Sequence, residues 1–132
     1  MELNIKQIIN GKWKENCYVV SNNNRDSLII DPGSDIESIT SYIEIYNLKV
    51  KIIINTHGHY DHIGAVAALK DKYSVPFCLH SKDQKLVNSA NLYLKIFDGE
   101  GPIAIPEVDY YYDEINIQDY ISFCLLYTSP SP

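Results

Sequence analysis

The most constraining feature of the chain is an apolar run, Val50 to Ile54, that leads directly into the sequence Thr-His-Gly-His-Tyr-Asp-His at residues 56–62. Three of the four histidines of the chain and one aspartate are crowded into this short segment. Imidazole nitrogens and carboxylate oxygens both bind zinc at about 2.0–2.2 Å. A surface loop that is rich in histidine by chance has no reason to follow a buried strand. The segment therefore predicts a metal site.

The candidate metal ligands are His57, His59, Asp61 and His62, in the pattern H-x-H-x-D-H. His57 and His59 alternate along an extended segment, so both side chains can point toward one ion. Asp61 and His62 follow where the chain turns, and they can reach a second ion beside the first. Gly58 leaves the backbone between the first two ligands without a side chain. The spacing is therefore compatible with two neighbouring metal ions.

Composition is that of an ordinary globular protein with one domain, or part of one. Hydrophobic residues make up 45% of the chain and charged residues 21%. The net charge of -6 and the scattered lysines argue against a nucleic-acid partner, because phosphate binding needs a basic surface. No apolar stretch is long enough to span a bilayer, and residues 1–10 lack the apolar core of a signal peptide. We expect a cytoplasmic protein that acts on a small molecule, with no membrane partner.

Strands are predicted wherever short apolar runs end at turn residues. Asn10-Gly11 predicts a tight turn between the first two strands, and Asp31-Pro32-Gly33 must turn after the third. The run at 50–54 is apolar enough to be buried on both faces of a sheet covered by helices. The predicted strands are residues 3–9, 17–20, 27–30, 50–54, 76–79, 108–112 and 115–123.

Three helices are predicted from helical spacing and capping residues. The first begins at Ser34, with Glu37 completing a capping box. The second covers residues 63–73, with Val66 and Leu69 facing inward, and the third begins at Ser81 with a capping box to Gln84 and a break between residues 88 and 91. The apolar stripe of the first helix is interpreted as core packing and comprises Ile36, Ile39, Ile43 and Tyr46.

Further polar side chains and thiols have weaker patterns. Open sheets with flanking helices bind ligands at the carboxyl ends of their strands, so Asp31 can meet the histidine cluster there. Asp31 either orients a ligand histidine from behind, without binding the ion itself, or simply begins its turn. His80 could approach the site, but a structural role at a strand end is favoured. Cys17 and Cys78 belong to no C-x-x-C pair and are interpreted as packing residues.

Taken with Asn16-Cys17-Tyr18 and Ile30-Asp31-Pro32-Gly33, the H-x-H-x-D-H motif resembles the metallo-β-lactamase superfamily, and most of all its glyoxalase II-like hydrolases, the hydroxyacylglutathione hydrolases. The resemblance covers nearly all of residues 1–123. It implies an α/β fold: the N-terminal half of a four-layer αββα sandwich, in which two sheets are covered by outer helices. The metal motif is highly specific for the superfamily and much less specific for the substrate.

The resemblance also implies a mechanism. His57 and His59 would help hold one metal ion, and Asp61 and His62 the other. The cofactor would be two Zn²⁺ ions in the parent protein, with iron or manganese also possible. A hydroxide between the ions would attack a thioester or related acyl substrate, with Asp61 as the catalytic residue that orients it.

One departure from the family pattern bears on activity. Family members carry a further histidine in a T-P-G-H-like segment, then a bridging aspartate and a last histidine, and no histidine follows His80 here. Each metal would lack a protein ligand, so the resemblance implies weak metal binding and little turnover by this chain. We interpret residues 1–123 as a partial metallo-β-lactamase domain. Residues 124–132 resemble the read-through of a sequencing adapter and are interpreted as a non-native tail, with a natural frayed terminus as the alternative.

Three other function classes remain open. The same scaffold can hold a single redox iron, as in persulfide dioxygenases, which are oxidoreductases. A nuclease is disfavoured by the acidic composition. A non-catalytic metal-binding fragment is the fourth class. Zinc would favour hydrolysis, and one iron per chain would favour oxygen chemistry.

Overall fold

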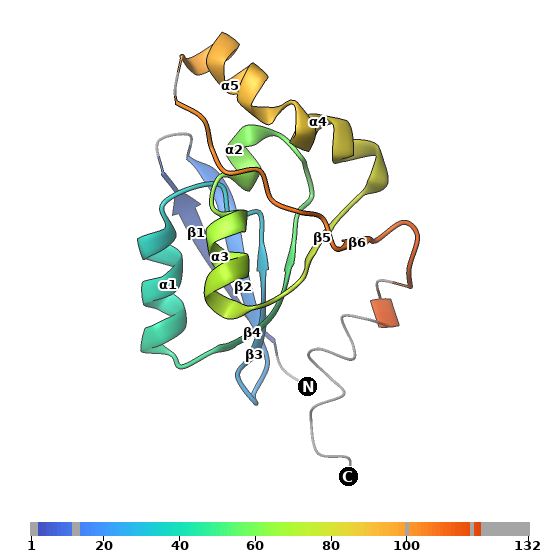
Figure 1. Ribbon diagram of the computed structural model, residues 1–132. Coiled ribbons are helices and arrows are strands. Elements are labelled where there is room, and N and C mark those ends of the chain that lie inside the picture. The colour runs from blue at the N-terminus through green and yellow to red at the C-terminus, as the bar shows by residue number, and fades with distance from the viewer. Residues whose placement is uncertain (1–2, 12–13, 100, 117, 120–132) are drawn as a thin grey trace.

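The computed structural model describes residues 3–11, 14–99, 101–116 and 118–119, and its centre is a six-stranded sheet (Figure 1). The strands lie in the sheet in the same order as in the sequence, β1-β2-β3-β4-β5-β6. The strands are β1 Asn4–Asn10, β2 Glu15–Ser21, β3 Asp26–Ile30, β4 Lys49–Ile54, β5 Phe77–Leu79 and β6 Tyr110–Tyr111. The helices are α1 Ile36–Ile45, α2 Tyr60–Ile63, α3 Val66–Tyr73, the 3₁₀ turn η1 Ser81–Asp83, α4 Gln84–Asn88 and α5 Ala90–Asp98.

The pairing of the strands changes once across the sheet, from antiparallel to parallel. β1, β2 and β3 are antiparallel neighbours, whereas β3, β4, β5 and β6 are parallel. Parallel neighbours need a crossover connection, which α1 supplies between β3 and β4, and α2 with α3 between β4 and β5. Ile30 is paired with Ile54, and Ile54 with Cys78. The carboxyl ends of β3, β4 and β5 therefore lie side by side at one edge.

The two faces of the sheet are packed differently. One face carries the main core, in which Ile39 and Ile43 of α1 and Val66 and Leu69 of α3 join apolar side chains of the strands. The opposite face carries a smaller cluster that contains Leu28, Ile52 and Cys78, with Val20, Ile30, Ile54 and Tyr112 packed against it. Ile52 and Ile53 point to opposite faces and are both fully buried, which confirms the prediction for the centre of β4.

The start of α1 differs from the prediction. The helix begins at Ile36, and its N-cap is Asp35, whose carboxylate accepts hydrogen bonds from the amide and the hydroxyl of Ser38. The predicted capping box from Ser34 to Glu37 is wrong because the amide of Ser34 donates to Oδ1 of Asn10, at 2.7 Å, and so holds Ser34 against the β1–β2 turn. The predicted apolar stripe is half right: Ile39 and Ile43 are buried, whereas Ile36 and Tyr46 are exposed.

The predicted helix 63–73 is two helices, α2 and α3. The break falls at Gly64 and Ala65, where the chain passes close to the turn after β3. The amide of Ala65 donates to the carbonyl of Pro32, and a Cβ on Gly64 would lie 2.0 Å from the carbonyl oxygen of Gly33. A tertiary contact therefore interrupts a segment whose local pattern is helical.

The third predicted helix is a 3₁₀ turn followed by α4 and α5, with the predicted break at Ser89. The predicted capping box is wrong: His80 is the cap, and its Nδ1 accepts a hydrogen bond from the amide of Lys82. Ser81 instead donates both its amide and its hydroxyl to Asp113. A long-range carboxylate has therefore replaced the local capping partner.

The segment after α5 forms less strand than predicted. The strand expected at 108–112 is reduced to β6, and Ile115 and Asn116 lie in a turn rather than in a strand. The rest of the predicted strand 115–123 lies largely outside the described residues, and the tail 124–132 lies wholly outside them. None of the helices in the described part of the chain has the length and apolar character needed to cross a bilayer.

Candidate metal centre

The histidine cluster begins where β4 ends. Asn55 follows β4 and is fully buried, and its Nδ2 donates to the backbone carbonyls of His62, at 2.6 Å, and His57, at 3.3 Å. One amide side chain thus ties together both ends of the loop that carries the candidate ligands. The sequence reading missed this residue, because an asparagine after a strand is ordinarily a simple turn former.

Asp31, which follows β3, contacts the same loop. Its Oδ1 accepts a hydrogen bond from the amide of Thr56 at 2.7 Å, and its Oδ2 accepts one from the hydroxyl of Thr56. The residue adopts φ 55°, in the left-handed region that non-glycine residues rarely occupy, and such conformations gather at functional sites. Asp31 therefore does more than begin a turn.

Thr56, which Asp31 contacts, also contacts His57. Its Oγ1 lies 2.9 Å from Nδ1 of His57. Since the hydroxyl proton is donated to Asp31, the oxygen of Thr56 is left to accept, so this network assigns the imidazole proton to Nδ1. The Nε2 atom of His57 then presents its lone pair, which is the form that ligates a metal. Thr56 is a second residue that the sequence reading missed.

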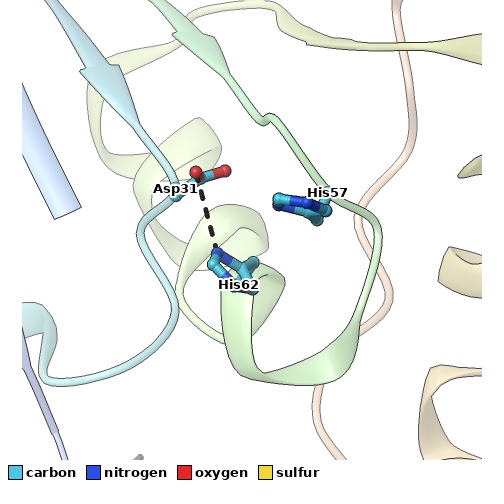
Figure 2. A group of neighbouring side chains, drawn as sticks. All are labelled: Asp31, His57 and His62. Atoms are coloured by element: carbon cyan, nitrogen blue, oxygen red, sulfur yellow. Dashed lines mark ion pairs between the residues drawn. The ribbon is translucent and has the colours of Figure 1, made fainter. Parts of the chain in front are cut away.

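Three side chains form the tightest group of candidate ligands: Asp31, His57 and His62 (Figure 2). Each offers one ligand atom, and these atoms lie within 4.8 Å of one another. Nδ1 of His62 lies 3.7 Å from Oδ2 of Asp31 and is buried without a hydrogen-bond partner among the described residues. Two imidazoles and one carboxylate, with one of the ring nitrogens left without a partner, fit a divalent transition metal.

His59 and Asp61 lie outside this group but beside it. The rings of His57 and His59 are 6.0 Å apart, and Oδ2 of Asp61 lies 3.8 Å from Nε2 of His62. His59 is exposed and Asp61 is half-buried, and both line the same cavity as His57 and His62. The structure thus brings all four motif residues to one cavity, and Asp31 lies beside His57 and His62 in the ligand group. The assignment of particular ligands to particular ions stays a prediction.

Negative charge accumulates around His62. The Asp31 carboxylate beside it raises the pKa of His62, burial of the ring opposes that shift, and Asp61 and Glu15 add to it. In the metal-free state this surrounding charge favours a proton on His62, which a metal ion must displace. The environment of the ring is therefore one that stabilises a cation.

Glu15 is the most unusual of the surrounding carboxylates. It is buried, and neither of its carboxylate oxygens has a hydrogen-bond partner among the described residues. Burial raises the pKa of Glu15. Its side chain lines a second cavity together with Asp31, Asp61 and His62. Glu15 could not be recognised from the sequence, since a single glutamate before a predicted strand is usually solvated.

Gly33 makes this crowding possible. A Cβ at this position would lie 1.9 Å from the carbonyl oxygen of Asp61 and 2.1 Å from Oε1 of Glu15. Only a residue without a side chain fits between the β3–α1 turn, the start of α2 and the first hairpin. The glycine thereby lets three segments meet behind the candidate ligands.

His80 and the cysteines have the structural roles favoured from the sequence. His80 caps η1, lies 3.8 Å from Asp113 and packs edge-on against Tyr112, and it is not a member of the ligand group. Cys17 and Cys78 are fully buried. Burial raises the pKa of Cys17 to about 12, so this thiol stays protonated.

Comparison with known proteins gives a consistent result. The sequence model of the metallo-beta-lactamase superfamily matches residues 10–118. An uncharacterized protein of Aquifex aeolicus is 36% identical over 106 residues, which are 80% of this chain and 49% of that protein. The hydroxyacylglutathione hydrolase GloC of Haemophilus influenzae is 36% identical over 73 residues, 55% of this chain and 34% of that protein.

Solved structures share the fold. The BLEG-1 B3 metallo-beta-lactamase superposes with a TM-score of 0.75 and 34% identity, over 82% of this chain and 52% of that one. TTHA1623 in a di-iron-bound form superposes with a TM-score of 0.71 and 30% identity, over 80% of this chain and 52% of that one. The chain thus spans about half the length of these two structures and of the Aquifex relative, and the predicted α/β fold is confirmed. The chain belongs to the metallo-β-lactamase superfamily.

Proposed function

We propose that this chain supplies the metal-binding half of a hydrolase that cleaves a thioester or a related acyl compound. The observation that carries the proposal is the contact from Asp31 through Thr56 to His57, with His62 beside it, at the carboxyl ends of β3 and β4. Hydroxyacylglutathione hydrolases among the relatives support the acyl substrate class. A small-molecule substrate, a cytoplasmic location and the absence of a nucleic-acid partner belong to the same proposal.

Five side chains of the chain are proposed to hold metal ions. Asp31, His57 and His62 hold a divalent metal, with His59 and Asp61 available for a second ion. A bound metal would lower the pKa of water to about 7 and polarise the acyl carbonyl group.

Positioning falls to residues around the ligands. Thr56 keeps the proton of His57 on Nδ1, so that Nε2 faces the centre. Asn55 holds the ligand loop closed. Asp61 is half-exposed at the cavity wall, where its carboxylate can accept a hydrogen bond from the attacking water and orient it.

Zinc is the proposed metal, with iron and manganese as alternatives. Imidazole and carboxylate donors suit all three ions, so the donor set alone does not choose between them. The di-iron form of TTHA1623, a structure 30% identical to this chain, supports iron as the second candidate. A single redox iron per chain would instead favour an oxidoreductase of the persulfide dioxygenase type.

The test uses the protein translated from the complete gene, purified without added metal. We expect elemental analysis to find zinc. We also expect the protein to hydrolyse acyl thioesters, which is measured as release of the free thiol. Asp61→Asn should lower kcat by at least about 10²-fold, in line with the loss of a general acid-base group. Full hydrolysis by that variant would remove Asp61 from the mechanism. Oxygen consumption with a persulfide, iron in place of zinc and no thioester cleavage would overturn the hydrolase proposal.

A further inference from the structure

A cavity of about 570 Å³ extends from the candidate ligands to the helices α4 and α5. His57, His59, Tyr60, Asp61 and His62 line one part of it, and Leu86, Tyr93 and Phe97 line another. Its volume is within the range of about 300–1,000 Å³ that is usual for small-molecule sites. A polar, metal-binding surface and an apolar surface thus share one space.

Two aromatic side chains of α5 form most of the apolar part. Tyr93 and Phe97 are four residues apart on the helix and therefore project from the same side. Their rings stack with centroids 6.3 Å apart and an angle of 23° between planes. Tyr93 is 37% exposed and Phe97 is 71% exposed, which leaves an aromatic surface open to solvent beside the candidate metal centre.

The position of this surface is fixed by the other side of the same helix. Ala90 and Leu94 of α5 are buried, as is Val87 of α4, and Ala90 and Val87 belong to the main core. Figure 1 shows α5 and α4 running along one end of the molecule, next to α2. The exposed aromatic pair is therefore held by a packed helix rather than by a loose terminus.

The lining carries no counter-charge for an anionic substrate tail. Among the described residues that line this cavity there is neither lysine nor arginine, and its acidic and imidazole groups all belong to the ligand motif. An apolar group gains from contact with such a surface, whereas a carboxylate-rich carrier finds no cation there. The chemistry of the wall thus favours an uncharged, apolar part of a substrate.

We propose that Leu86, Tyr93 and Phe97 form the binding wall for an apolar acyl group, either an aliphatic chain of several carbons or an aromatic ring, while the acyl carbonyl lies at the ligand motif. This inference rests on the proposed hydrolase function and names the substrate class of the same site. Each methylene that the wall buries should strengthen binding about fourfold. The site would then prefer medium-length or aromatic acyl groups over acetyl.

The test measures binding rather than turnover. Acetohydroxamate and octanohydroxamate carry the same metal-chelating head group and differ in chain length, and their affinities for the zinc-loaded protein from the complete gene are measured by calorimetry. We expect octanohydroxamate to bind at least about tenfold tighter. Phe97→Ala should remove most of that difference and leave the affinity for acetohydroxamate unchanged.

The same helix offers matched controls. Leu92 and Ile96 are 58% and 63% exposed, and neither lines the cavity. Leu92→Ala and Ile96→Ala should therefore keep the full chain-length preference. Because all three residues are largely exposed, these variants should fold like the parent, which their melting temperatures would verify. If either control variant loses as much of the chain-length preference as Phe97→Ala does, the proposed binding wall is wrong.

Thioester hydrolysis on the same preparation separates the two proposals. Hydrolysis together with equal affinity for the two hydroxamates would overturn the wall and leave the hydrolase standing. Chain-length-dependent binding that Phe97→Ala removes, without hydrolysis of any thioester, would support the wall and reject the hydrolase. Aromatic side chains already covered by another segment or by a second copy would give equal affinities, which is again the overturning result.

Discussion

Asp31 and Thr56 are joined by two hydrogen bonds through a single carboxylate, one to the backbone amide at 2.7 Å and one to the side-chain hydroxyl. The first bond fixes where the ligand loop leaves β4. The second fixes the direction of the hydroxyl proton, and through it the tautomer of His57. Asp31 is thus a candidate ligand itself and, through Thr56, also determines how the ring of His57 is presented.

Thr56→Val keeps the shape of the side chain and removes the hydroxyl. We expect metal affinity to fall about 10- to 100-fold, as is typical when a partner of a ligand histidine is lost. Titration with zinc in competition with a chromophoric chelator measures this. Thr40→Val is the control, because among the described residues the hydroxyl of Thr40 bonds only to the carbonyl of Glu37 in its own helix. Equal affinities in the parent and Thr56→Val would show that Thr56 does not orient His57.

Glu15→Gln replaces a buried, unpartnered carboxylate with a neutral amide. We expect the metal-free variant to be more stable at pH 7 by on the order of 1–3 kcal/mol, because a buried charge without a partner costs more to desolvate than a neutral amide. Burial raises the pKa of Glu15 in the folded state. The parent protein therefore loses stability as the pH rises from the unfolded pKa toward the higher folded pKa.

Urea unfolding at pH 4 and at pH 7 tests this. The gap in unfolding free energy between Glu15→Gln and the parent should be large at pH 7 and small at pH 4. A variant less stable than the parent at pH 7 would mean that the carboxylate has a stabilising partner.

His62 gives a pH dependence in the metal-free protein. Asp31 raises its folded pKa, so its contribution to stability is complete below the unfolded pKa of about 6.5 and is lost as the pH rises through the folded value. Metal binding has the opposite dependence, since the ion competes with the proton and should bind more tightly at higher pH. Melting temperatures with and without zinc at several pH values give both slopes. His62→Gln should flatten the slope of the metal-free protein.

Gly33→Ala places a methyl group against the carbonyl of Asp61 and the carboxylate of Glu15. We expect a loss of unfolding free energy of about 1–3 kcal/mol, the usual range for overpacking, with weaker metal binding as α2 shifts. Gly101→Ala is the matched control, because nothing lies within 4 Å of a Cβ there. Thermal unfolding of the two variants makes the comparison. Equal melting temperatures would show that the turn after β3 can shift to accommodate the methyl group without loss of stability.

The parts of the structure that local pattern determines were predicted well. Ile52 and Ile53 lie in a continuous apolar run and are buried on opposite faces, and the break near Ser89 was visible in the sequence. Asp31 was reached from the general rule that strand ends meet at one edge. The rule gives the neighbourhood of a residue and not its hydrogen bonds.

The two errors in helix capping share one physical cause, a distant partner that outcompetes a local one. The side chain of Asn10 accepts a hydrogen bond from the amide of Ser34, so Ser34 does not form the predicted capping box of α1. In the same way, the carboxylate of Asp113 accepts a hydrogen bond from the amide of Ser81 before α4. Thr56 and Glu15 gave no signal because their roles depend on contacts between segments that only the folded chain brings together. Asn55 gave none because its bonds to His57 and His62 depend on how the loop closes.

The sheet adds its strands in the order in which they are synthesised, from β1 to β6. At a translation rate of roughly 5–20 residues per second, each new strand emerges from the ribosome when the edge that it joins has already been made. The ligand loop after β4 then appears next to an Asp31 that is already in place. The candidate ligands Asp31, His57 and His62 can therefore meet before the later strands of the sheet have been made.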